Sequence, residues 1–182
     1  LTEVFVVDLP ENVTMPPADG LLQGTATTRP LPPRGAEQRR ITFTGDRVNP
    51  GVQGPRFWVR SSPDGARLAF LMKDDAGVVQ IYTVSPNGGD ITQLTHNAFS
   101  VASAISWSSD GKLIAYAGEG GVFVTDVDNG ETSEVAPRSS DQPVRPMAVV
   151  FSPDSRSIAY QRAVPAADGT AWNQVFVTSL TP

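Results

Sequence analysis

SSPDGARLAF at residues 61–70 returns twice further along the chain without a gap. The second copy is WSSDGKLIAY at 107–116, and the third is FSPDSRSIAY at 151–160. The copies place Asp64, Asp110 and Asp154 at one repeat position, 46 and 44 residues apart. A repeat of this length sets the architecture of the whole chain.

Each copy centres on a tight turn. Proline fixes φ at the first central position of such a turn, aspartate caps nearby N–H groups with its carboxylate, and glycine accepts a positive φ. The residues expected in these roles are Asp64, Gly65, Asp110, Gly111 and Asp154. A short apolar strand precedes each turn and another strand follows it, which predicts three antiparallel strand pairs.

A second repeating element follows each turn. The stretch VQIYTVSPNGGDITQLT at 79–95 aligns with GVFVTDVDNGETSEVA at 121–136, so that Tyr82 matches Phe123 and Gly89 matches Gly130. Each stretch is typical of strand, turn, strand. Its first strand returns at 3–8 and 174–178, and its final Gln-Leu-Thr returns as Arg-Ile-Thr at 40–42.

Together these elements predict an all-β chain of 13 strands, organised as four-stranded antiparallel blades of a β-propeller. Residues 1–182 would form a partial propeller of about three and a quarter blades. The predicted units are an incomplete blade at 1–43 with a Pro-rich insertion at 10–37, blades at 57–96 and 102–136, and a blade at 147–180 that lacks its last strand. No segment has a sustained helical period, which excludes an α-solenoid.

These residues resemble a known repeat. The Ser-x-Asp-Gly turn, the apolar-Ala-aromatic triplet after it and the Gln-Leu-Thr ending are similar to the blade repeat of TolB-like β-propellers. QRRITFTGDRVNPG at 38–51 and GGDITQLTHN at 88–97 resemble the C-terminal half of a bacterial TolB-like propeller family of unknown function. The resemblance implies a protein about twice this length, and it brings no catalytic residues with it.

The strand count predicts that this chain does not close on itself. It begins with the third and fourth strands of a blade and ends after a third strand, whereas closed propellers leave no free sheet edge. We therefore expect a fragment of a larger propeller, with closure supplied by the missing half or by a second subunit. The insertion at 10–37 holds six prolines and is expected to lie over the propeller surface or to be partly disordered.

Composition narrows the classes of partner and chemistry. A net charge of −5 argues against a nucleic-acid partner. The absence of cysteine excludes disulfides and thiolate catalysis, and one histidine cannot serve a catalytic triad whose serine context is missing. The longest apolar run is far shorter than the roughly 20 residues that cross a bilayer, so we expect no transmembrane segment. The sequence indicates no cofactor. It is compatible with either the bacterial periplasm or the cytoplasm as the compartment.

Three residues are candidates for contact with a partner. Arg60 follows the aromatic pair Phe57-Trp58 at the entrance of a strand that would line the central channel, and His96 and Arg145 lie on connections between blades. Two further motifs are assigned as hairpins. The stretch 126–131 misses the spacing of a calcium loop by one residue, and the glycines of 118–121 are followed by no helix that could bind phosphate.

The leading hypothesis is a non-catalytic propeller that binds a protein, peptide or small molecule at its loop-bearing end, because function on such scaffolds lies in the loops. The connections between blades, at 44–56, 96–101 and 137–146, vary while the strands repeat. One alternative is the substrate-gating propeller of a prolyl-oligopeptidase-like hydrolase. Another is a carbohydrate-processing propeller whose metal ligands lie outside this chain.

Overall fold

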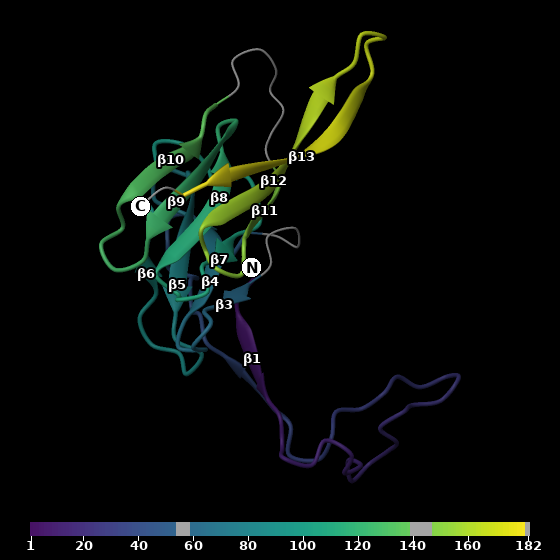
Figure 1. Ribbon diagram of the computed structural model, residues 1–182. Helices are drawn as coiled ribbons and strands as arrows, with labels where there is room; N and C mark the ends of the chain where they lie inside the picture. The colour runs from purple at the N-terminus through teal and green to yellow at the C-terminus, as the bar shows by residue number, and fades with distance from the viewer. Residues whose placement is uncertain (54–58, 139–146, 181–182) are drawn as a thin grey trace.

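The computed structural model describes residues 1–53, 59–138 and 147–180 of the chain. Within these residues the chain folds into 13 strands and no helix (Figure 1). The strands are β1 (Phe5–Asp8), β2 (Glu37–Arg40), β3 (Arg60–Ser61), β4 (Leu68–Lys73), β5 (Val79–Val84), β6 (Thr92–Gln93), β7 (Ser106–Trp107), β8 (Leu113–Gly118), β9 (Gly121–Asp126), β10 (Thr132–Ala136), β11 (Met147–Phe151), β12 (Ser157–Pro165) and β13 (Ala171–Ser179).

The strands form four antiparallel sheets in which chain neighbours are also spatial neighbours. The sheets have the orders β1-β2, β3-β4-β5-β6, β7-β8-β9-β10 and β11-β12-β13. The second and third sheets are complete four-stranded meanders, and the first and last carry two and three strands. This architecture confirms the predicted fold class, an all-β partial propeller of four-stranded antiparallel blades.

Successive sheets stand in the same orientation, so their turns gather at two ends. The turns after β3, β7 and β11 lie together. The Ser109 and Ser155 hydroxyls of neighbouring sheets are 2.9 Å apart, and Gly111 lies beside Pro63 of the turn after β3. We refer to this end as the turn end. The hairpins from β4 to β5, β8 to β9 and β12 to β13 lie at the opposite end, together with the described residues that directly follow β2 and β6. We refer to that end as the loop end.

The three turns share one set of hydrogen bonds. In the second sheet the Ser62 hydroxyl donates to the Asp64 carboxylate at 2.6 Å and accepts the Arg67 N–H at 3.0 Å. The Asp64 carboxylate also accepts the Ala66 N–H at 3.0 Å. The same bonds recur at Ser108 with Asp110 and at Ser152 with Asp154.

A positive φ ends each turn. It is 71° at Gly65, 72° at Gly111 and 57° at Ser155. Glycine adopts this conformation without steric cost, whereas Ser155 holds it against the preference of an L-residue. The Ser155 hydroxyl accepts the Ser109 N–H at 2.7 Å, a contact that ties this less favourable turn to its neighbour.

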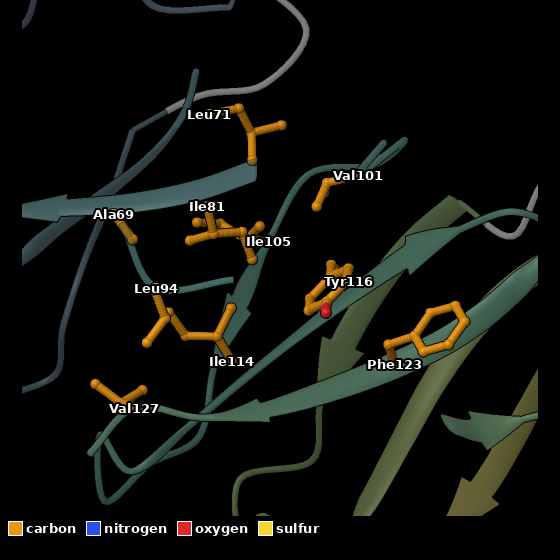
Figure 2. Packing of buried hydrophobic residues seen from close by; sticks show 10 residues of the cluster. All are labelled: Ala69, Leu71, Ile81, Leu94, Val101, Ile105, Ile114, Tyr116, Phe123 and Val127. Carbon is orange, nitrogen blue, oxygen red and sulfur yellow. The ribbon is translucent and has the colours of Figure 1, made fainter. Parts of the chain in front are cut away.

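Apolar side chains fill the space between successive sheets. Figure 2 shows the cluster between the second and third sheets, where Ile81 and Leu94 from one sheet meet Ile114 and Phe123 from the next. A second cluster joins the third and fourth sheets, and a third joins the first and second. Burial of this apolar surface is the main force that stacks the sheets.

The two motifs assigned as hairpins are hairpins in the structure. Glu119 and Gly120, with φ of 45° and 83°, make a two-residue turn between the paired Gly118 and Gly121. Two positive φ values at these positions match the right-handed twist of the flanking strands. In the second hairpin the Asp126 carboxylate accepts the N–H groups of Asp128 and Asn129, so it caps the turn between β9 and β10.

The Pro-rich insertion departs from its expected position. Residues 9–36 connect β1 to β2 and extend away from the sheets as a long arm, rather than lying over the propeller surface (Figure 1). The arm keeps its own contacts, such as the hydrogen bond from the Arg34 N–H to the Met15 carbonyl at 3.1 Å. Its apolar residues are too few and too dispersed to hold it against the core.

No helix in the described part of the chain is long and apolar enough to cross a membrane.

Candidate functional site

A polar pocket opens at the loop end of the second sheet. Its volume is about 290 Å³. Three segments line it, namely the connection that follows β2, the hairpin between β4 and β5, and the end of β6. The lining residues are Arg47, Asp74, Asp75, Ala76, Gln93 and His96.

A chain of hydrogen bonds positions one wall of the pocket. Arg47 Nη2 donates to the Tyr82 hydroxyl at 3.3 Å, and this hydroxyl donates to Gln93 Oε1 at 2.9 Å. Gln93 Nε2 lies 3.2 Å from His96 Nδ1. Since an amide nitrogen can only donate, His96 Nδ1 is the acceptor, and its Nε2 is left for other partners. Tyr82, which is 1% exposed, anchors these side chains to the core.

Arg47 brings a cation to this wall. Its guanidinium lies over the Tyr82 ring, 5.2 Å from the ring centroid. Its Nε is buried and has no hydrogen-bond partner among the described residues. Burial raises the pKa of the Tyr82 hydroxyl, Arg47 lowers it, and the carboxylates of Asp74 and Asp75 raise it further. Tyr82 is therefore a neutral hydrogen-bonding residue near neutral pH.

The two aspartates of the pocket differ in how they are used. The Asp74 carboxylate accepts the Val78 N–H at 2.9 Å and Gln80 Nε2 at 3.2 Å, so it holds the hairpin in shape. Asp75 is exposed, and none of the side-chain hydrogen bonds found in the described residues uses its carboxylate. Asp75 and His96 can therefore offer an acceptor and an imidazole to a ligand, and the Arg47 guanidinium adds positive charge to the lining.

The structure separates Arg60 from His96. Arg60 lies on β3, paired with Ala69, directly before the turn at the turn end. His96 follows β6, the opposite edge strand of the same sheet, and lines the pocket at the loop end. Arg60 is exposed, and its carbonyl accepts Trp107 Nε1 from the next sheet at 3.2 Å. Arg145 and the pair Phe57-Trp58 lie outside the described residues.

A second feature of the loop end is the length of the hairpin between β12 and β13. Both strands have nine residues, and the hairpin projects beyond the other sheets (Figure 1). Val164 and Trp172 are paired across it and are 38% and 62% exposed. At its base, Arg162 Nη2 donates to the carbonyls of Gly120 and Pro137 at 3.0 and 2.9 Å, which fixes the hairpin to the third sheet.

His96 is the one candidate named from the sequence that lines this pocket, and the sequence did not single out Arg47, Asp75 or Gln93. Arg47 lies in one of the variable connections that were expected to carry specificity, and Asp74-Asp75 closes a strand pair, so position alone could have drawn attention to both. Nothing in the sequence shows that segments 46 residues apart line one pocket. Within residues 1–53, 59–138 and 147–180, no cluster of three His, Asp or Glu side chains could hold a metal ion.

Comparison with known proteins places the chain in a family. Residues 47–181 match the model of the Lipoprotein LpqB beta-propeller domain. The Uncharacterized protein YidR of Escherichia coli K12 is 41% identical over 161 residues, covering 87% of this chain and 39% of YidR. The Uncharacterized peptidase YuxL of Bacillus subtilis 168 is 30% identical over 102 residues, covering 54% of this chain and 14% of YuxL.

Solved structures show the same fold at lower identity. A putative TolB from Agrobacterium tumefaciens aligns with a TM-score of 0.51 and 24% identity, covering 80% of this chain and 55% of that chain. The tricorn protease aligns with a TM-score of 0.61 and 16% identity, covering 79% of this chain and 13% of that one. This chain spans about two fifths of the length of YidR. Because the family model matches residues 47–181, which is most of the chain, and the repeats are TolB-like, the chain belongs to the LpqB-type β-propeller domain family.

Proposed function

We propose that the chain is part of a non-catalytic propeller that binds a protein, peptide or small-molecule partner at its loop end. The observation that carries the proposal is the polar pocket lined by Arg47, Asp75 and His96. Stacked sheets hold the pocket on a rigid base, and the connections around it vary in sequence. Binding residues commonly lie on loops held by such a scaffold.

The chemistry of the pocket defines the partner's anchor group. Asp75 presents a carboxylate with free acceptor capacity, while Arg47 contributes positive charge and His96 a ring nitrogen to the same pocket. A matching anchor carries a donor, such as an ammonium or amide N–H, beside an acceptor oxygen. The exposed Trp172 offers apolar area on the same end of the molecule, and tryptophan is enriched at the centres of protein interfaces.

Site-specific crosslinking in the longer natural protein tests this proposal. A photoreactive residue in place of Ala76, an exposed residue at the pocket, should capture a partner. The same residue in place of Ala66, an exposed alanine at the turn end, should capture none. Asp75→Asn should reduce capture at least fivefold, and Asp46→Asn, which removes the same charge outside the pocket, should leave it unchanged.

The same assay tests Arg60 and Arg145, which we propose as further contacts on the strand and connection where the sequence placed them. If Arg60→Ala abolishes capture while Asp75→Asn does not, the partner binds at the inner strand rather than in the pocket. Capture that survives Arg47→Ala, Asp75→Asn and His96→Ala would contradict the pocket as the binding site.

A second function is supported by the likeness to the peptidase YuxL over 102 residues. In that case the propeller would belong to a hydrolase and would control access to a separate catalytic domain. The coding sequence of the longer protein decides between the two functions. A Gly-x-Ser-x-Gly elbow with downstream acidic and histidine partners would support the hydrolase, and its absence would eliminate it.

A further inference from the structure

The hairpin between β12 and β13 is longer than the sheet that it packs against. In the third sheet the pairing of β8 with β9 ends at a two-residue turn, and the Gly120 carbonyl of this turn accepts Arg162 Nη2 at 3.0 Å. Val164 and Trp172 form the next pair outward on the same face of the hairpin. This pair therefore lies beyond the tip of the third sheet.

The exposure of Trp172 follows from this difference in length. Tyr160 and Phe176 are paired on the same face, and Tyr160 belongs to the cluster between the third and fourth sheets. Trp172 thus faces the third sheet, which has all four strands, yet it is 62% exposed, and Val164 is 38% exposed. A sheet following β13 would cover the opposite face. We refer to Val164 and Trp172 as the ledge.

The Pro-rich arm carries an extended segment that suits an exposed tryptophan. Residues 29–33 have the sequence Arg-Pro-Leu-Pro-Pro. Proline fixes its own φ and drives the residue before it into an extended conformation, which favours a polyproline II helix. Leu31 packs against Gly20 of the arm, whereas Pro30 and Pro32 are exposed. Such preformed segments dock on aromatic side chains at little cost in conformational entropy.

The arm and the ledge lie at opposite ends of the molecule (Figure 1). The arm leaves the first sheet at the turn end, where Arg39 Nη2 lies 3.5 Å from the Pro86 carbonyl, in the turn between β5 and β6. That turn follows Val84, which is paired with Leu68 directly after a turn of the turn end. The ledge lies at the loop end. The two features of one molecule therefore point away from each other.

The charges around the two features differ in sign. Arg29 and Arg34 flank the prolines of the arm. Around the ledge three carboxylates face two guanidinium groups, namely Glu119, Glu134 and Asp168 against Arg138 and Arg162. Arg162 is directed onto the carbonyls of Gly120 and Pro137, whereas Asp168 lies at the hairpin tip beyond Trp172. A basic segment is thus matched to slightly acidic surroundings.

We propose that the arm of one copy of the chain docks on the ledge of a second copy. Pro30 and Pro32 pack on the Trp172 ring, and the flanking arginines approach Asp168. The contact joins different surfaces of the two copies, so it links them head to tail, and every copy keeps one free arm or ledge unless a ring closes. It is separate from the polar pocket, which the first and second sheets line.

A peptide copied from the arm tests the docking step. The probe is TTRPLPPRG, residues 27–35, with a fluorescent label, and the control is the same peptide with Pro30→Ala and Pro32→Ala. Fluorescence anisotropy measures binding to the 182-residue chain. The proline peptide should bind at least fivefold more tightly than its control. Trp172→Ala in the chain should weaken it roughly tenfold, as expected for a tryptophan anchor. Phe43→Ala, which removes another exposed aromatic ring, should change nothing.

A mixing experiment tests the link between copies. The Trp172→Ala chain keeps its arm and loses its ledge, whereas the chain with Pro30→Ala and Pro32→Ala keeps its ledge and loses its arm. In analytical ultracentrifugation each variant alone should associate less than the unchanged chain. An equal mixture should form a complex of one copy of each, because a single arm and a single ledge are available and the complex cannot grow.

Three results would overturn the proposal. The first is equal binding of the two peptides, or binding that survives Trp172→Ala. The second is association of each variant as strong as that of the unchanged chain, which would place the contact elsewhere. The third is specific peptide binding with no complex in the mixture, which would mean that the ledge takes a proline-rich segment of another protein.

Discussion

The tripeptide Val-Phe-Val occurs at 122–124 and 175–177, in the third strands of two successive sheets, and its burial differs sharply between them. In the third sheet Val122, Phe123 and Val124 are 0%, 3% and 7% exposed. In the fourth sheet Val175 and Val177 are 70% and 66% exposed, and Phe176 is 36% exposed. The tripeptide and its place in the strand order are the same, so the difference comes from what surrounds it. In the third sheet β10 and the following sheet cover the tripeptide, whereas the structure describes neither a fourth strand nor a following sheet beside β13.

The first sheet gives the opposite pattern for the same tripeptide. Val4 is 4% exposed and Phe5 is 50% exposed. In each strand the phenylalanine faces the preceding sheet and the valines face the following sheet. Phe123 belongs to the cluster between the second and third sheets, and Val122 belongs to the cluster between the third and fourth sheets. Each end of this array therefore exposes the side chains whose partners would belong to a further sheet.

The largest expected effect follows from shortening the two phenylalanines. Phe123→Ala should lower the free energy of unfolding of the chain by about 3–5 kcal/mol, because it leaves a cavity beside Phe99 and Tyr116. Phe176→Ala should cost less than half as much, because its ring packs mainly on Tyr160. Urea denaturation measures both values. Equal costs would mean that the fourth sheet is packed as completely as the third.

Shortening the valines should give a smaller contrast. Val122→Ala should cost about 2 kcal/mol, since it removes two methyl groups from a fully buried position. Val175→Ala should stay within about 0.5 kcal/mol, as expected for an exposed site. The comparison becomes sharper in a longer protein that contains further blades. There Val175→Ala should approach the cost of Val122→Ala if another sheet covers this face.

The turns should behave alike in the two sheets, because their hydrogen bonds are local. Ser108→Ala and Ser152→Ala each leave a backbone N–H without its acceptor, that of Leu113 or of Ser157. We expect losses of about 1–2 kcal/mol, with the fully buried Ser108 at the upper limit. Thermal unfolding of the two variants measures this. If the two losses differed as much as those of the two phenylalanine variants, the stabilisation by the turns would not be local.

The smallest effect is a dependence on pH. The hydrogen bond from the neighbouring serine, followed by a backbone N–H, lowers the pKa of Asp64, Asp110 and Asp154 below the usual value. A carboxyl with a lowered pKa stabilises the folded state at neutral pH, and this contribution is lost as the pH falls below about 4. Replacing all three by asparagine should make the free energy of unfolding fall less steeply as the pH drops into the acid range. An unchanged slope there would show that other carboxylates, such as Glu3, dominate it.

The fold could be predicted from the sequence because its determinants are local and repeated. The serine and aspartate of each turn supply their own hydrogen bonds within six residues, and the same unit recurs at the spacing expected of stacked sheets. The direction of the Pro-rich arm could not be predicted, because it depends on the lack of contacts with the core. Composition predicts that such a segment does not fold alone, and says nothing about where it extends.

The candidate site was less accessible to sequence reasoning. His96 could be named as a candidate because it lies on a connection between blades, whereas the other lining residues Arg47 and Asp75 come from other segments and have common side chains. Arg60 was placed correctly near the start of a blade, yet the register puts it beside the turn and away from His96. A site assembled across sheets depends on the register of several strands, which a single sequence does not report.

The projecting arm also decides how the chain would respond to a protease. The arm is mostly exposed and extends away from the sheets, and a cut within residues 9–36 would break no pairing between β1 and β2. The hydrogen bonds of Glu3 with Thr42 and Thr44, and the ion pair of Arg40 with Glu3 at 3.1 Å, would hold the severed N-terminal piece in place. A nicked chain would therefore migrate as one species on a native gel and as two on a denaturing gel. The same loop would accept a tag or an inserted domain without disturbing the blades.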